Sequence, residues 1–198
     1  MYRNGTDYDK LDELIYSIYI DYDIKEFPID EKELCQKMQI DLVPYSALSD
    51  EAKKLLQKKS KHAFFVKESK ENSPTIYYND RFESEGAVRL SIFHEIKHYV
   101  CEDEDDSKDD LADYFARHFM CPTAYLMLKD IKSPNEIISF CGVSFEAACH
   151  ASANIEKRRQ KLGLTLLSYE KEFIQQIDSI VLYRHEQQEK EEKCEFTK

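Results

Sequence analysis

The chain has 198 residues and a mass of 23.4 kDa, with 42% hydrophobic and 34% charged residues, which is enough apolar material for a folded core and excludes wholesale disorder. Its 28 basic and 39 acidic residues give a formal net charge of −11, a balance that disfavours binding to polyanions over most of the surface. The 4 glycines are far apart in the sequence. Neither a dinucleotide-binding GxGxxG nor a P-loop can therefore be written.

The sequence shows neither a recognisable targeting signal nor the cysteine pattern of an exported protein. No apolar stretch approaches the roughly 18 residues of a membrane span, and the first residues lack the basic start and apolar core of a secretory signal. The 6 cysteines contain no CxxC pair, which argues against a zinc ribbon and suits reduced thiols. We expect a soluble, cytoplasmic protein with no membrane partner.

The first two thirds of the chain predict helices around a small three-stranded sheet. In chain order, we expect a helix over about Tyr8 to Tyr22, a second opening at Pro28, strands at IDLVPY, HAFFVKE and TIYYN, and helices over about Ser84 to Cys101 and Asp109 to Met120. The strand from Thr75 to Asn79 is expected at the sheet edge, where its free backbone groups could pair with an extended peptide. The fold class is α+β.

The last third is predicted to be helical, and we divide the chain into a core of residues 1–132 and an extension of residues 133–198 packed on it. Two helices separated by Gly142 span Ser133 to Lys161 and resemble a helix-turn-helix. A long terminal helix, with apolar residues repeating from Phe173 to Val181, follows. The helix pair could read DNA through its second helix, but two packed helices need the same pattern. We favour packing or protein docking, because the surrounding charge is acidic.

The most informative motif is His94-Glu95-Ile96-Lys97-His98, which has the HExxH form of zinc peptidases. Residues four apart share a helix face, so both imidazoles can reach one metal ion. Glu95 lies about 100° around the helix, where a base for the attacking water is needed. The alternative is an amphipathic helix with two solvated histidines. His62, His150 and His185 have no partner at metal-ligand spacing, and we assign them no role. His118, nine residues after Asp109 and about half a turn from that ligand face, is expected to be a surface or packing residue.

A third zinc ligand is sought downstream, because catalytic zinc sites use three protein ligands. Asp109 could bind the metal while Asp113, one turn later, accepts a hydrogen bond from a ligand imidazole. Asp110 is the close competitor of Asp109, and Cys101 is a weaker one. These aspartates could also serve only to complement the dipole of the helix that they begin.

The sequence resembles the ImmA/IrrE metallo-endopeptidases, a zincin-like family of bacteria, their phages and mobile elements. The resemblance rests on four blocks between about Phe27 and Ile155: FPIDEKELCQKMQIDLVPY, TIYYNDRFESEGAVRLSIFHEIKHYV, DDLADYFARHFMCP and VSFEAACHASANI. It implies that His94, His98 and Asp109 bind zinc and that Glu95 is the base. The family usually has Glu at the position of Asp109, and it tends to be aliphatic before the proline of FMCP, Phe119 to Pro122.

The resemblance also implies a function. We expect a zinc endopeptidase that cleaves a specific protein, such as a helix-turn-helix repressor of a phage, a mobile element or a stress response, and that does not bind nucleic acid. Two alternatives stay open: an inactive binding module that keeps the fold, and a DNA-binding regulator with a structural zinc site.

Overall fold

The computed structural model describes residues 5–70, 73–82, 84–102 and 109–195. The segment from Glu102 to Asp110 has seven acidic residues and one lysine, and its sequence predicts a solvated loop; most of it lies outside these ranges. Ten α-helices are described: α1 (Gly5–Asp21), α2 (Glu31–Lys37), α3 (Asp50–Lys59), α4 (Glu85–Val100), α5 (Asp109–Met120), α6 (Thr123–Leu128), α7 (Pro134–Cys141), α8 (Phe145–Leu162), α9 (Ser168–Ile177) and α10 (Ser179–Glu195). Three strands and one 3₁₀ turn complete the described elements: β1 (Asp41–Pro44), η1 (Tyr45–Ala47), β2 (Ala63–Val66) and β3 (Thr75–Tyr78). The predicted α+β class is confirmed.

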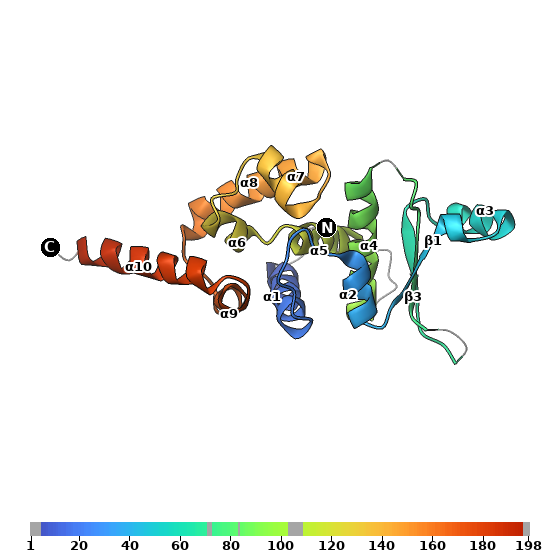
Figure 1. The fold of residues 1–198 in the computed structure, drawn as a ribbon, viewed down its shortest axis with the longest axis horizontal. Helices are drawn as coiled ribbons and strands as arrows, with labels where there is room; N and C mark the ends of the chain where they lie inside the picture. Colours follow the sequence, from blue (N-terminus) through green and yellow to red (C-terminus); the bar gives the residue numbers. More distant parts are fainter. Residues whose placement is uncertain (1–4, 71–72, 83, 103–108, 196–198) are drawn as a thin grey trace.

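The sheet has the order β1-β3-β2, with β3 parallel to β1 and antiparallel to β2. The prediction that Thr75–Asn79 forms an edge is therefore wrong, because β3 is paired on both sides. The prediction followed the order of the strands in the chain, but the third strand lies between the first two in the sheet. The free edges belong to β1 and β2, and α4 lies against the β2 and β3 part of the sheet (Figure 1).

The HExxH motif lies on α4, whose ends follow from local sequence signals. The Ser84 hydroxyl accepts a hydrogen bond from the Ala87 amide and caps the first turn. Ile92, Phe93 and Ile96 are buried on one face of the helix, and α4 packs most extensively on α5. The same pattern places the histidines on the remaining arc, between the sheet and α5.

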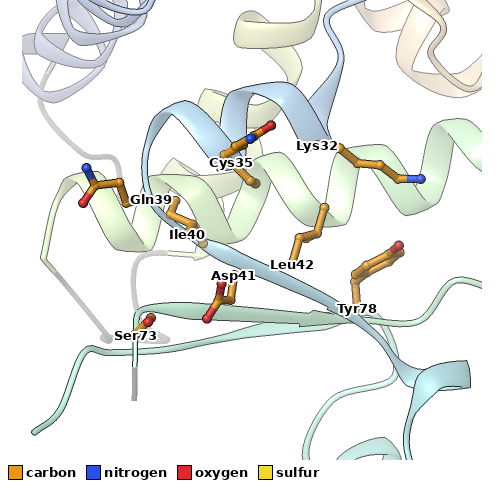
Figure 2. Close-up of a pocket in the computed structure, with 9 residues that line it drawn as sticks. Lys32, Cys35, Gln39, Ile40, Asp41, Leu42, Ser73 and Tyr78 are labelled. Carbon is orange, nitrogen blue, oxygen red and sulfur yellow. The ribbon is translucent and has the colours of Figure 1, made fainter. Parts of the chain in front are cut away.

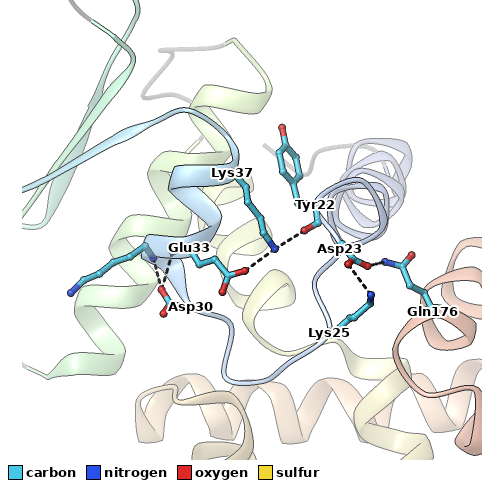
Figure 3. Close-up of polar contacts among 8 residues, drawn as sticks. Tyr22, Asp23, Lys25, Asp30, Glu33, Lys37 and Gln176 are labelled. Carbon is cyan, nitrogen blue, oxygen red and sulfur yellow. Dashed lines mark hydrogen bonds and ion pairs between the residues drawn. The ribbon is translucent and has the colours of Figure 1, made fainter.

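Helix α2 starts three residues later than expected. Pro28 precedes the helix, and the Asp30 carboxylate caps it by accepting hydrogen bonds from the amides of Lys32 at 2.8 Å and Glu33 at 3.0 Å (Figure 3). An Asp cap satisfies the first amides of a helix, which a proline cannot do. Sequence signals thus located this helix but not its first residue.

A buried arginine on α4 joins three separate segments. The Arg89 side chain forms an ion pair with Glu31 at 2.9 Å and donates to the carbonyls of Cys141 at 3.0 Å and Gly142 at 2.7 Å. It also donates to the carbonyl of Ile29. Because Arg89 is only 5% exposed, these acceptors are what allow its charge to be buried. Arg89 therefore holds α2 and the end of α7 against the motif helix.

We expect Arg89→Met to destabilise the fold strongly. Methionine fills similar space but leaves the Glu31 carboxylate and the backbone carbonyls without their donor, and breaking a buried ion pair costs about 3–5 kcal/mol. The free energy of unfolding from urea denaturation measures this loss. Arg159→Met changes an exposed arginine on α8 and should stay within about 0.5 kcal/mol of wild type. Equal effects of the two variants would contradict the role of Arg89.

The predicted helix-turn-helix unit corresponds to α7 and α8, and its turn packs against α4. Gly142 ends α7 in the left-handed region with φ 63°. Gly86, in the first turn of α4, faces the same turn so closely that an added Cβ would lie 2.4 Å from the Ser144 amide nitrogen. The unit is therefore seated on the motif helix through backbone contact, as the packing interpretation requires.

The C-terminal helices join the same core as the N-terminal ones. Phe173 and Ile174 of α9 are buried in one apolar cluster with Ile15 and Tyr19 of α1. Gln176 also donates to Asp23 in the loop after α1 at 2.9 Å (Figure 3). The apolar repeat does not form one long helix, because Asp178 is non-helical and separates α9 from α10. The boundary at residue 132 stays a prediction.

Among the described residues, no helix combines the length and the apolarity that crossing a membrane requires.

Candidate metal centre

Helices α4 and α5 bring His94, His98 and Asp109 together, and we call these three residues the metal group. One potential ligand atom from each side chain lies within 4.8 Å of the others, and His94 Nε2 lies 4.0 Å from Asp109 Oδ1. His98 is buried, His94 is partly buried and Asp109 is exposed. Two imidazoles and a carboxylate at this spacing fit the donor set of a catalytic zinc site.

The start of α5 decides which aspartate faces the histidines. Asp109 and Asp110 are the first two residues of the helix, and residues next to each other point about 100° apart. In the part of the chain that the structure describes, the group that could hold a metal contains Asp109 and not Asp110 or Cys101. The geometry favours the assignment of Asp109 that the sequence suggested.

Asp113 lies one turn after Asp109 and contacts the other nitrogen of His94. The distance between His94 Nδ1 and Asp113 Oδ1 is 2.9 Å. This contact orients the imidazole so that Nε2 points toward Asp109 and the metal position, as carboxylate partners of ligand histidines commonly do. The predicted role of Asp113 is thus compatible with its position.

The contact between His94 and Asp113 shifts the pKa values of both side chains. Burial alone would lower the pKa of His94, but the hydrogen bond with Asp113 and the charges of Glu95, Asp113 and Asp109 raise it above its usual value. Conversely, the hydrogen bond with His94 lowers the pKa of Asp113, and the nearby charge of Arg117 acts in the same direction. In the metal-free protein the imidazole therefore holds its proton to higher pH, and that proton competes with the metal.

We expect Asp113→Asn to weaken metal binding about 10- to 100-fold, because it removes the charge that orients His94. It should also lower the pKa of His94 in the metal-free protein. A zinc titration against a competing chelator measures the first effect, and the pH dependence of the His94 ring signals in NMR spectra measures the second. Asp110→Asn is the matched control. An unchanged pKa of His94 would contradict the contact.

Glu95 lies beside the metal group and contacts the sheet. Its Oε2 accepts a hydrogen bond from the Phe65 amide at 2.8 Å. Burial raises the pKa of Glu95, while the charges of His94 and His98 and the Phe65 amide oppose that rise. A carboxylate with a raised pKa is a better proton acceptor than a solvated one.

The Phe65 amide was missed by sequence reasoning, because a backbone donor leaves no signal in residue types. Phe65 is paired with Ile76 of β3 by register, yet its amide donates to Glu95. The amide therefore points away from β3, to the free edge of β2. His62, to which the sequence assigned no role, lies just before β2 and is close enough to Asp113 to help lower its pKa.

A separate cavity of about 490 Å³ lies between α2 and the sheet (Figure 2). None of its lining residues belongs to the metal group. Cys35 borders the cavity, but burial raises the pKa of its thiol to about 12, so it remains protonated at neutral pH. The chemistry of the molecule is thus expected at the metal group and not in this cavity.

Comparison with known proteins agrees with the geometry of the site. The sequence model of a protein family, the IrrE N-terminal-like domain of peptidase family M78, matches residues 42–152, more than half of the chain. No curated protein and no solved structure matches. The matched region runs from β1 into α8 and contains all the residues of the candidate metal centre. The chain belongs to the IrrE N-terminal-like family of metallopeptidases, peptidase family M78.

Proposed function

We propose that the protein is a zinc-dependent endopeptidase with His94, His98 and Asp109 as metal ligands and Glu95 as the base. The observation that carries this proposal is a three-ligand group with a carboxylate beside it. Structural zinc sites close with four protein ligands, whereas catalytic ones leave a position for water or substrate. Within the described residues, the group offers three.

In the proposed reaction, Glu95 acts first as the proton acceptor and then as the proton donor. Zn²⁺ bound in the group would polarise the scissile carbonyl and lower the pKa of water toward ~7. Glu95 takes a proton from the water molecule as the water oxygen adds to the carbonyl carbon. Glu95 then passes this proton to the amide nitrogen as the C–N bond breaks. The Phe65 amide engages Oε2, which leaves Oε1 to carry the proton.

We propose the edge of β2 as the place where the substrate backbone pairs. The Phe65 amide connects this edge directly to Glu95, so an extended peptide added there has its backbone beside the base. Edge addition uses backbone hydrogen bonds and requires no particular substrate sequence. This replaces β3, which is central in the sheet.

The substrate class and the place of action rest on the family. We propose a cytoplasmic enzyme that cleaves a specific protein, such as a helix-turn-helix repressor. The contacts of α8 support a packing role over DNA reading, because Arg158 forms an ion pair with the buried Glu170 at 2.8 Å. Arg158 is thus committed to holding α9 and is a poor reporter of DNA contacts.

The test is proteolysis of candidate repressors and of a protein mixture, read as new N-termini by mass spectrometry. Wild-type protein with zinc should produce them, and the same protein treated with a chelator should not until zinc is restored. Glu95→Gln should give none. Cleavage that survives in Glu95→Gln would refute the proposal.

A further inference from the structure

Helix α3 stands apart from the rest of the molecule. It connects η1 to the segment before β2 and lies at the far end of the sheet from the helical body (Figure 1). None of its residues is buried, and Leu55 is 66% exposed. Because a helix without buried residues contributes little to a hydrophobic core, α3 is not explained by packing.

The charge of this segment is opposite to that of the chain. Residues 50 to 61 contain two acidic residues, Asp50 and Glu51, and five lysines: Lys53, Lys54, Lys58, Lys59 and Lys61. The chain as a whole carries −11. A local positive field of this kind attracts negatively charged partners to one place.

The five lysines differ in their contacts from several other lysines of the chain. Lysines elsewhere form ion pairs, such as Lys37 with Glu33 at 2.8 Å and Lys129 with Asp178 at 3.2 Å. In residues 5–70, 73–82, 84–102 and 109–195, no ion pair involves any of the five. Lys59 instead lies over the Phe64 ring, 4.4 Å from its centroid. Among the described residues, these lysines form no ion pair with the many acidic side chains of the chain, which leaves their charge for an outside partner.

Local helix stability accounts for only part of the pattern. Asp50 and Glu51 at the start of α3 and Lys58 and Lys59 in its last turn complement the helix dipole. Lys53 and Lys54 lie in the middle of the helix, where the dipole effect has decayed. Lys58 and Lys59 follow the exposed Leu55 by three and four residues on the same helix face, so the surface offers positive charge beside an apolar side chain.

We propose that α3 and Lys61 form a docking surface for an acidic segment of the protein substrate. This rests on the proposed peptidase function. The chain runs from α3 directly into β2, the edge strand whose Phe65 amide contacts Glu95. An acidic segment held on α3 therefore places the neighbouring part of the same polypeptide at the edge where cleavage is proposed.

An acidic polypeptide fits this surface better than a nucleic acid. Ten helical residues span about 15 Å, and the remainder of a chain of net charge −11 repels the long, dense charge of a duplex. A flexible acidic peptide can confine its charge to the helix and place an apolar residue on Leu55. We therefore commit to a protein partner.

The test is a binding measurement that requires no cleavage. The probes are a fluorescein-labelled 12-residue peptide of glutamates with one central leucine, its glutamine counterpart, and a labelled 20-base-pair duplex. Fluorescence anisotropy at 50 mM salt compares Glu95→Gln protein with the same protein carrying K53Q, K54Q and K58Q. A control carries K10Q, K157Q and K190Q, which remove the same charge from exposed positions in α1, α8 and α10, on the opposite side of α4 from α3 (Figure 1).

The acidic peptide should bind and its glutamine counterpart should not. The α3 variant should weaken binding about tenfold, since each exposed pair contributes modestly, and the control should change it less than twofold. No binding, equal weakening by both sets, or tighter binding of the duplex through α3 would overturn the inference. Circular dichroism verifies that the α3 variant keeps its helices. Because the assay needs no hydrolysis, its failure leaves the proteolysis test of the function intact.

Discussion

Glu95→Gln should retain the metal while its kcat for protein cleavage falls about 10²- to 10⁴-fold, the usual contribution of a general base. Glutamine has nearly the same shape as glutamate, and its carbonyl oxygen can still accept the hydrogen bond from the Phe65 amide. It cannot take a proton from water. The variant therefore removes the proton transfer and leaves the metal ligands and the sheet contact in place.

Two measurements make this result specific. Metal content by mass spectrometry should equal that of wild type, because Glu95 is not in the ligand group. Glu85→Gln, the same substitution at an exposed position in the first turn of α4, should change kcat less than twofold. Loss of metal in Glu95→Gln with the fold intact would show that Glu95 is a ligand, and the assigned role would then be wrong.

The sequence located the motif helix and its neighbour closely because their signals are local. Ser84 before α4 and Pro122 after α5 act on the backbone within one turn of their own positions. The three strands were found for a similar reason, since β-branched and aromatic residues cluster in each of them. Helix α3 was not predicted, although Ser49 caps its start and Ala52, Leu55 and Leu56 stand at helical spacing; the apolar set is short, and none of the residues of α3 is buried.

What the sequence could not show depends on contacts between distant segments. The order β1-β3-β2 follows from tertiary packing, and a residue count along the chain does not contain it. The burial of Arg89 among acceptors from α2 and α7 was not predicted, because these acceptors come from segments far from α4 in the sequence. The link between the Phe65 amide and Glu95 spans 30 positions and involves a backbone atom that every residue type except proline provides.

Asp109→Ala should weaken zinc binding by more than about 100-fold, whereas Asp110→Ala should leave it nearly unchanged. Removing a direct ligand costs more than removing an outer partner of a ligand, which is typically 10- to 100-fold. Both substitutions remove one negative charge from the first turn of α5, so both should cost a similar 0.3 to 1 kcal/mol, roughly, in the stability of the metal-free protein. The difference between them therefore isolates coordination from the helix-dipole effect.

Asp109→Glu extends the comparison, because the resembling family usually has glutamate at this position. The added methylene lengthens the reach from α5 to His94, whose Nε2 lies 4.0 Å from Asp109 Oδ1. If α5 can adjust to that length, zinc affinity should stay within about tenfold of wild type, since a carboxylate of either residue binds zinc. Zinc titration against a competing chelator, with unfolding measured in parallel, gives all three results. Loss of zinc in Asp110→Ala alone would show that the second helix presents its next residue to the histidines, and the ligand assignment would shift by one position.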